Sequence, residues 1–156
     1  MPSTTQILAI RHGETTWNRD GRIQGHLDVD LNANGRWQAE RLAQALREEP
    51  IAAFYASDLA RAHETAQTVA RLHGATVQTH ASLRERGFGT YQGQTWAALE
   101  ALHPEGVAAW RRREPGFAPP GGESLLQLQA RVLAIVGELA QRHAGQQLLI
   151  VAHGGV

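Results

Sequence analysis

Three short polar segments of the chain carry side chains suited to chemistry on phosphate. They are Arg11-His12-Gly13-Glu14, Ser57-Asp58-Leu59-Ala60-Arg61 and His153-Gly154-Gly155, and each directly follows an apolar run. Guanidinium groups donate paired hydrogen bonds to phosphate oxygens and stay charged at any working pH. A histidine held neutral can attack phosphorus, and adjacent glycines let the backbone approach a bulky anion closely. Each segment is weak evidence alone, but together they favour phosphoryl transfer through a histidine.

The apolar runs before these segments are expected to be strands of one sheet. Predicted strands cover 7–10, which we expect to be buried on both faces, 51–56, 147–152 and, more weakly, 75–79. Predicted helices cover 32–48, 57–72, 94–102 and 123–143, with loops at 11–30 and 83–93. Alternating strands and helices predict the α/β class, here a three-layer α/β/α sandwich with a mostly parallel sheet. Ligands of such folds bind beyond the carboxyl ends of the strands, so the three polar segments should meet there.

Two details of the helices can be predicted from local pattern. Asn32 is a good N-cap for the first helix, which should turn Trp37, Leu42, Ala45 and Leu46 toward the core. Ser57 and Asp58 should cap the second helix in the same way.

Composition and charge exclude several other kinds of protein. Fifteen basic and fifteen acidic residues cancel, so no overall field favours nucleic acid or an anionic membrane as partner. The chain has no cysteine, which excludes disulfides and thiolate catalysis. No apolar run is long enough to span a membrane, and residues 1–6 lack a signal-peptide pattern, so we expect a cytoplasmic protein.

No metal site or cofactor is expected from the sequence. The remaining histidines show no metal-ligand spacing, and we expect them to be surface or packing residues. They are His26, His63, His73, His80, His103 and His143.

The ordered set of motifs resembles the histidine phosphatase superfamily, which includes the cofactor-dependent phosphoglycerate mutases. The resemblance extends over nearly the whole chain. Its segments are Arg11-His12-Gly13-Glu14-Thr15-Thr16-Trp17-Asn18, Gly21-Arg22-Ile23-Gln24-Gly25, Ser57-Asp58-Leu59-Ala60-Arg61-Ala62, Thr65-Ala66, Leu83-Arg84-Glu85, Gly121-Gly122-Glu123-Ser124 and Ala152-His153-Gly154-Gly155-Val156.

The resemblance implies a role for each matched side chain. His12 matches the histidine that becomes phosphorylated, and Glu85 matches the general acid that protonates the leaving oxygen and later deprotonates water. Arg11, Arg61 and His153 match the residues that bind the phosphoryl group and stabilise its transition state. Asn18, Gln24 and Gly154 are the further phosphate- or substrate-binding positions that the resemblance implies, in the bacterial phosphatase branch. The family needs no metal.

A phosphatase, a mutase and an inert scaffold remain as alternatives. The mutases carry a long insertion between the acid and the Gly-Gly-Glu-Ser segment, whereas here only residues 86–120 separate Glu85 from Gly121. A short cap leaves a phosphohistidine open to water, which favours a phosphomonoester hydrolase over a phosphoglycerate mutase. A catalytically inert phospho-ligand-binding scaffold is favoured less, because no implied catalytic residue is missing.

The resemblance also sets expectations for organisation and partners. Residues 1–156 should form a single histidine phosphatase domain that lacks its C-terminal elements, since family members usually continue beyond the second histidine. The substrate should be a small phosphorylated metabolite, and its leaving group should meet residues 88–120. Residues 96–110 are either an apolar cap over the site or a helix packed on the domain. A homodimer through a sheet edge is one arrangement left open.

Overall fold

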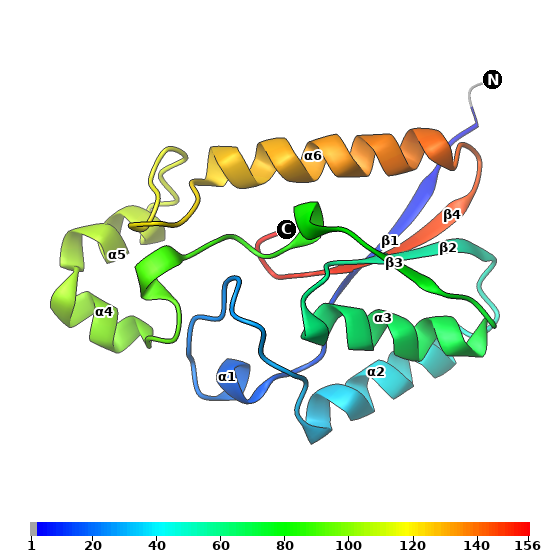
Figure 1. Ribbon diagram of the computed structural model, residues 1–156, viewed down its shortest axis with the longest axis horizontal. Coiled ribbons are helices and arrows are strands. Elements are labelled where there is room, and N and C mark those ends of the chain that lie inside the picture. Colours follow the sequence, from blue (N-terminus) through cyan, green and yellow to red (C-terminus); the bar gives the residue numbers. More distant parts are fainter. Residues whose placement is uncertain (1–2) are drawn as a thin grey trace.

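The computed structural model describes residues 3–156, which form a four-stranded parallel sheet between layers of helices (Figure 1). The strands follow the order β1-β4-β2-β3 across the sheet, and every strand pairing is parallel. Their bounds are β1 Gln6–Arg11, β2 Ile51–Ala56, β3 Val77–Thr79 and β4 Gln147–Ala152. All four strands therefore end at the same edge of the sheet.

Helices cover both faces of the sheet. α2 (Ala33–Ala45) and α3 (Ala60–Leu72) lie on one face, and α6 (Leu125–Arg142) lies along the other (Figure 1). Each face has its own apolar core, one built with α2 and α3 and the other with α6. The α/β/α sandwich predicted from the sequence is confirmed. No helix within residues 3–156 is long and apolar enough to cross a membrane.

The prediction that the first strand is buried on both faces was wrong. β1 lies at an edge of the sheet, and its residues are exposed or half-buried. The strand enclosed on both sides is β4, which pairs with β1 and β2 and is buried from Leu148 to Ala152. A short apolar run alone does not distinguish an edge strand from a central one, because strand order depends on long-range pairing.

The predicted core face of α2 was also partly wrong. Trp37 is 59% exposed and Ala45 is exposed as well, whereas Gly35, Ala39 and Ala43 are buried. Ala43, with Leu42 and Leu46 beside it, packs in the core shared with α3, whereas Gly35 lies against the backbone of Gly13 and Glu14. Trp37, the largest apolar side chain of α2, therefore led to the wrong prediction of which helix face packs on the core.

The cap of α3 differs from the prediction. Leu59 occupies the N-cap position and makes no capping bond through its side chain. The Asp58 carboxylate instead accepts two hydrogen bonds from Arg84, at 2.7 and 2.6 Å. Asp28 supplies the capping acceptor, because its Oδ1 accepts a hydrogen bond from Ala60 N at 2.8 Å. The cap thus comes from the loop before α2, which local sequence cannot reveal.

Three short helices form the remainder of the structure near the site. α1 (Thr16–Arg19) lies within the segment predicted as loop, and α4 (Trp96–Leu102) and α5 (Pro104–Arg111) extend from one end of the molecule (Figure 1). α5 was not predicted, although Pro104 at its first turn is a favoured start signal. Leu99 and Val107 of these two helices share a small core with Ile23, Tyr91 and other residues.

Candidate active site

The register of the sheet brings together the two polar segments that contain a histidine, 11–14 and 153–155. Arg11 pairs with Ala152 at the ends of β1 and β4, so His12 and His153 are the next residues on adjacent strands. Their ring centroids are 5.2 Å apart. β2 ends on the other side of β4, which places the start of α3 and its Arg61 beside the same edge. The strand-end argument made from the sequence holds for all three segments.

His12 is held in the form that a nucleophile requires. Its Nδ1 lies 2.7 Å from the carbonyl oxygen of Gly13, which can only accept, so Nδ1 carries the proton and Nε2 keeps its lone pair. The side chain is 8% exposed, and burial together with the charges of Arg61 and Arg11 lowers the pKa of His12 to about 4. His12 is therefore neutral near pH 7.

His153 is a buried imidazole without a protein partner. Neither ring nitrogen forms a hydrogen bond with any of residues 3–156, and burial, followed by the charge of Arg61, lowers the pKa of His153 to about 2. His153 is therefore neutral near pH 7. A bound phosphate dianion would raise that pKa and provide the missing hydrogen-bond acceptor.

Two arginines differ in how firmly they are held. Arg61 is buried, and its Nη1 and Nη2 donate to the carbonyl oxygens of Leu27 and Gly25, both at 2.8 Å. Its Nε is buried without a partner, which leaves this donor for an anion. Burial lowers the pKa of Arg61 to about 10, so the side chain remains cationic at neutral pH. Arg11 is exposed at the mouth of the site and lies against Gly154.

Thr15 orients two amide side chains of the site. Its Oγ1 lies 3.0 Å from Asn18 Oδ1 and 2.8 Å from Gln24 Oε1, so both amide oxygens face the threonine. The amide nitrogens of Asn18 and Gln24, which are donors, are left for an anion. Thr15 and Asn18 also form the capping box of α1, which fixes this arrangement at the start of the helix.

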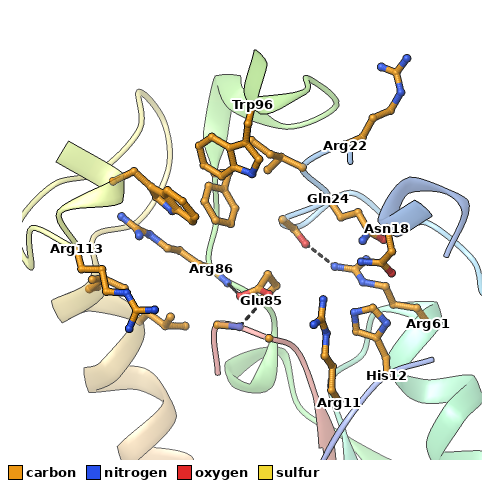
Figure 2. Close-up of a pocket in the computed structure, with 18 of the residues that line it drawn as sticks. Arg11, His12, Asn18, Arg22, Gln24, Arg61, Glu85, Arg86, Trp96 and Arg113 are labelled. Carbon is orange, nitrogen blue, oxygen red and sulfur yellow. Dashed lines mark hydrogen bonds between the residues drawn. The ribbon is translucent and has the colours of Figure 1, made fainter. Parts of the chain in front are cut away.

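Glu85 lines the same cavity as His12 (Figure 2). Its carboxylate oxygens accept hydrogen bonds from Arg86 N at 2.7 Å and from Gly155 N at 3.1 Å. Neither neighbouring arginine pairs with this carboxylate, because Arg84 binds Asp58 and the Arg86 side chain binds backbone carbonyl oxygens. The carboxyl group is half-buried and reaches the cavity from a different chain segment than the histidines do.

These residues surround a cavity of about 760 Å³. Figure 2 shows Arg11, His12 and Arg61 at one end, with Asn18 and Gln24 above them, and Arg86, Trp96 and Arg113 toward the other end. Trp96 packs on Trp110 with ring centroids 4.1 Å apart, and both line the cavity together with Phe88. The segment 96–110 therefore does both things considered from the sequence: its tryptophans cover the site while Leu99 and Val107 pack in a core.

The structure brings together every site residue predicted from the sequence. All of them line the cavity except His153, whose ring packs beside that of His12. Sequence reasoning missed two kinds of contributor: the threonine that orients the amides, and the side chains that hold the Glu85 segment. The last group includes His26, whose Nε2 lies 2.8 Å from Glu85 O. Within residues 3–156, no cluster of three or more histidine, aspartate or glutamate side chains could hold a metal ion.

A neutral histidine beside two arginines, with a carboxyl group on the same cavity at the strand ends of a parallel α/β sheet, is an arrangement suited to phosphoryl transfer. The chain belongs to the histidine phosphatase superfamily (branch 1), whose family model matches residues 7–156.

Named relatives are similar over almost the whole chain. A phosphoglycerate mutase-like protein 4 and a metal-independent phosphoserine phosphatase, both of Arabidopsis thaliana, are 43% and 40% identical over 97% of this chain. A glucosyl-3-phosphoglycerate phosphatase of Mycobacterium tuberculosis is 35% identical over the same share. The chain spans 67%, 65% and 71%, respectively, of the lengths of these relatives.

Solved structures show the same fold. The mycobacterial glucosyl-3-phosphoglycerate phosphatase in complex with VO3 superposes with a TM-score of 0.88 at 36% identity, covering 94% of this chain and 74% of that one. Bacillus stearothermophilus YhfR gives a TM-score of 0.89 at 34% identity, covering 97% of this chain and 75% of that one.

Proposed function

We propose that the chain hydrolyses phosphate monoesters through a phosphohistidine formed on His12. The observation that carries this proposal is the hydrogen bond from His12 Nδ1 to Gly13 O, which leaves Nε2 unprotonated in a site lined by arginines. Nε2 attacks phosphorus, the bond from phosphorus to the leaving oxygen breaks, and the Glu85 carboxylic acid gives its proton to that oxygen. Glu85, now a carboxylate, takes a proton from water, whose oxygen bonds to phosphorus as the bond to Nε2 breaks.

The remaining polar residues would hold the phosphoryl group during both steps. Phosphoryl transfer depends mainly on positioning and on positive charge around the equatorial oxygens. Arg11 and Arg61 supply that charge, so the proposal assigns no metal or other cofactor. The unpartnered nitrogens of Arg61 and His153 would each find an acceptor on the bound group. Asn18, Gln24 and the backbone of Gly154 would complete the pocket.

The substrate proposed is a small phosphorylated metabolite of the cytoplasm. Relatives named for phosphoserine and glucosyl-3-phosphoglycerate support this substrate class. The leaving group would lie against the wall of Phe88, Trp96 and Trp110, which forms the opposite end of the cavity. The single domain and the homodimer expected from the sequence stay predictions.

Phosphoglycerate mutase activity is the second candidate, because one relative is named as a mutase-like protein and others as probable mutases. Hydrolysis is preferred because only residues 86–120 separate Glu85 from Gly121, and so short a cap gives water a route to the intermediate. Faster interconversion of phosphoglycerates than release of phosphate would reverse this preference.

The test is release of phosphate from 4-nitrophenyl phosphate in the presence of a metal chelator. We expect turnover by the wild-type protein and a loss on the order of 10⁴-fold or more in His12→Ala. His63→Ala is the matched control, since His63 lies on α3 and its side chain makes no hydrogen bond within residues 3–156. Equal release by wild type and His12→Ala would reject the proposal.

A further inference from the structure

An ion pair outside the cavity holds the segment that carries Glu85. Arg131 lies on α6, and Glu123 lies two residues before the start of that helix; two hydrogen bonds join their side chains. Arg131 Nε donates to Glu123 Oε1 at 2.7 Å, and Nη2 donates to Oε2 at 2.8 Å. Both side chains are 21% exposed, and neither lines the cavity. A largely buried ion pair joined by two hydrogen bonds has a fixed geometry, unlike most exposed ion pairs.

The remaining donors of Arg131 bind the backbone on the N-terminal side of the acid and at the acid itself. Nη1 donates to the carbonyl oxygens of Ser82 and Arg84, and Nη2 donates to that of Glu85, each at 2.8 Å. The segment 84–88 belongs to no helix or strand and so lacks the regular backbone hydrogen bonds of those elements. The bonds from Arg131 take their place in fixing the backbone. One guanidinium thus sets the path of the backbone up to Glu85.

Glu123 binds the backbone on the C-terminal side of the acid. Its Oε2 accepts a hydrogen bond from Gly87 N at 2.6 Å, and its own N–H donates to Gly87 O at 2.7 Å. Its carbonyl oxygen accepts from Arg86 Nε at 2.8 Å. The bond from Arg131 lowers the pKa of Glu123, so it stays a carboxylate and keeps accepting these bonds.

We propose that Arg131 and Glu123 are positioning residues for the Glu85 general acid and base. The two side chains bracket Glu85, and within residues 3–156 its carboxyl group is hydrogen-bonded only to the N–H groups of Arg86 and Gly155. Misplacing a catalytic group by about 1 Å can cost on the order of 10²-fold in rate. The proposal rests on the hydrolase function proposed above.

The step that depends on this position is proton transfer to the leaving oxygen. When Nε2 of His12 bonds to phosphorus, an alkoxide leaving group needs the Glu85 proton as its bond to phosphorus breaks. A 4-nitrophenolate is stable without that proton. Errors in the placement of Glu85 should therefore slow phosphorylation by benzyl phosphate far more than phosphorylation by 4-nitrophenyl phosphate.

The experiment compares Arg131→Lys and Glu123→Gln with wild type on these two substrates, using rapid mixing to measure the rate of phosphoenzyme formation. We expect a loss of about 10- to 100-fold with benzyl phosphate, a loss at least several-fold smaller with 4-nitrophenyl phosphate, and little change in KM. In a Glu85→Gln background the same two substitutions should cause no further loss. The exposed pair Arg142–Glu138 at the other end of α6 provides matched controls, Arg142→Lys and Glu138→Gln, which should behave as wild type.

Three outcomes would overturn the positioning role. They are equal losses on both substrates, an undiminished loss in the Glu85→Gln background, and no loss in either variant. Thermal unfolding identifies a variant that does not fold, and Glu123→Gln, which keeps the size of the side chain, then carries the test alone. Failure of the hydrolase function is a separate result, because it would appear as equal activity of wild type and His12→Ala.

Discussion

The two ends of the catalytic cavity are built in different ways. At the phosphate end, His12 and His153 directly follow paired residues of β1 and β4, and Arg61 lies in the first turn of α3 after β2. At the acid end, Glu85 lies in an irregular segment that a single pair, Arg131 and Glu123, ties to α6. The sheet fixes the first end, and side-chain bonds to the backbone fix the second.

This difference predicts different consequences of substitution. Residues of the phosphate end lie at the carboxyl ends of packed strands. A substitution there should therefore act locally, on phosphate binding and on the charge around the phosphoryl group. The acid end depends on a chain of hydrogen bonds, so a change outside the cavity can move the reacting group. Substitutions at each end should therefore differ in how their effects depend on the leaving group.

Among substitutions that distinguish the two ends of the cavity, Arg61→Lys at the phosphate end should lower kcat/KM the most. Lysine cannot bind both loop carbonyl oxygens and present a further donor to phosphate, so kcat/KM should fall by about 10²- to 10³-fold. The loss should be equal for benzyl and 4-nitrophenyl phosphate, because Arg61 acts on the phosphoryl group. Steady-state kinetics test this, with Arg71→Lys on the same helix as the control. A loss below tenfold would contradict the assigned role.

A somewhat smaller effect is expected from Gly155→Ala at the acid end. A Cβ at this position would overlap Glu85 Oε1. The other carboxylate oxygen, Oε2, accepts a hydrogen bond from Gly155 N. Displacement of the carboxyl group should lower kcat for benzyl phosphate by up to about 10²-fold, and less for 4-nitrophenyl phosphate. Gly137→Ala in α6 is the control, since a Cβ there meets nothing within 4 Å. Identical losses on both substrates would place Gly155 with the phosphate end instead.

The smallest effect concerns the stability of the phosphate end at acid pH. The pKa values of His12 and His153 are lowered from 6.5 to about 4 and about 2. Below pH 6.5 the unfolded state therefore binds more protons than the folded state does. Above pH 6.5 both histidines are neutral in the folded and the unfolded state, so they add no pH dependence there, and stability should fall as pH drops below 6.5. Each histidine should contribute at most about 1.4 kcal/mol per pH unit. Urea unfolding between pH 7 and 5 should show a shallower loss for His153→Asn than for wild type; parallel curves would refute this.

The sequence predicted the phosphate end better than the acid end for a physical reason. The rule that ligands meet strand ends placed Arg11, His12 and His153 together, because each lies next to a strand recognisable from its apolar run. Glu85 follows no strand directly, and only the family resemblance assigned it a role. Arg131 lacked any signal, since the carbonyl oxygens that it binds lie 46 to 49 positions away and its carboxylate partner Glu123 lies 8 positions away.

The errors in the predicted fold have a similar origin. Trp37 was placed inward because large apolar residues usually mark a core face, yet α2 packs in the core shared with α3 through Ala43 and two leucines. The cap of α3 comes from Asp28, which lies 32 positions from Ala60. Local pattern identified the elements, whereas burial and capping depended on contacts formed only in the folded chain.

The most direct test of the account is to trap the covalent intermediate. Glu85→Gln protein should be mixed with 4-nitrophenyl phosphate and quenched within milliseconds to seconds, because this substrate needs no acid to phosphorylate the enzyme and the variant lacks the base for hydrolysis. The account predicts an acid-labile, alkali-stable phosphoryl group that peptide mass spectrometry locates on His12. A phosphoryl group on a serine, an aspartate or another histidine, or continued turnover in His12→Ala, would contradict it.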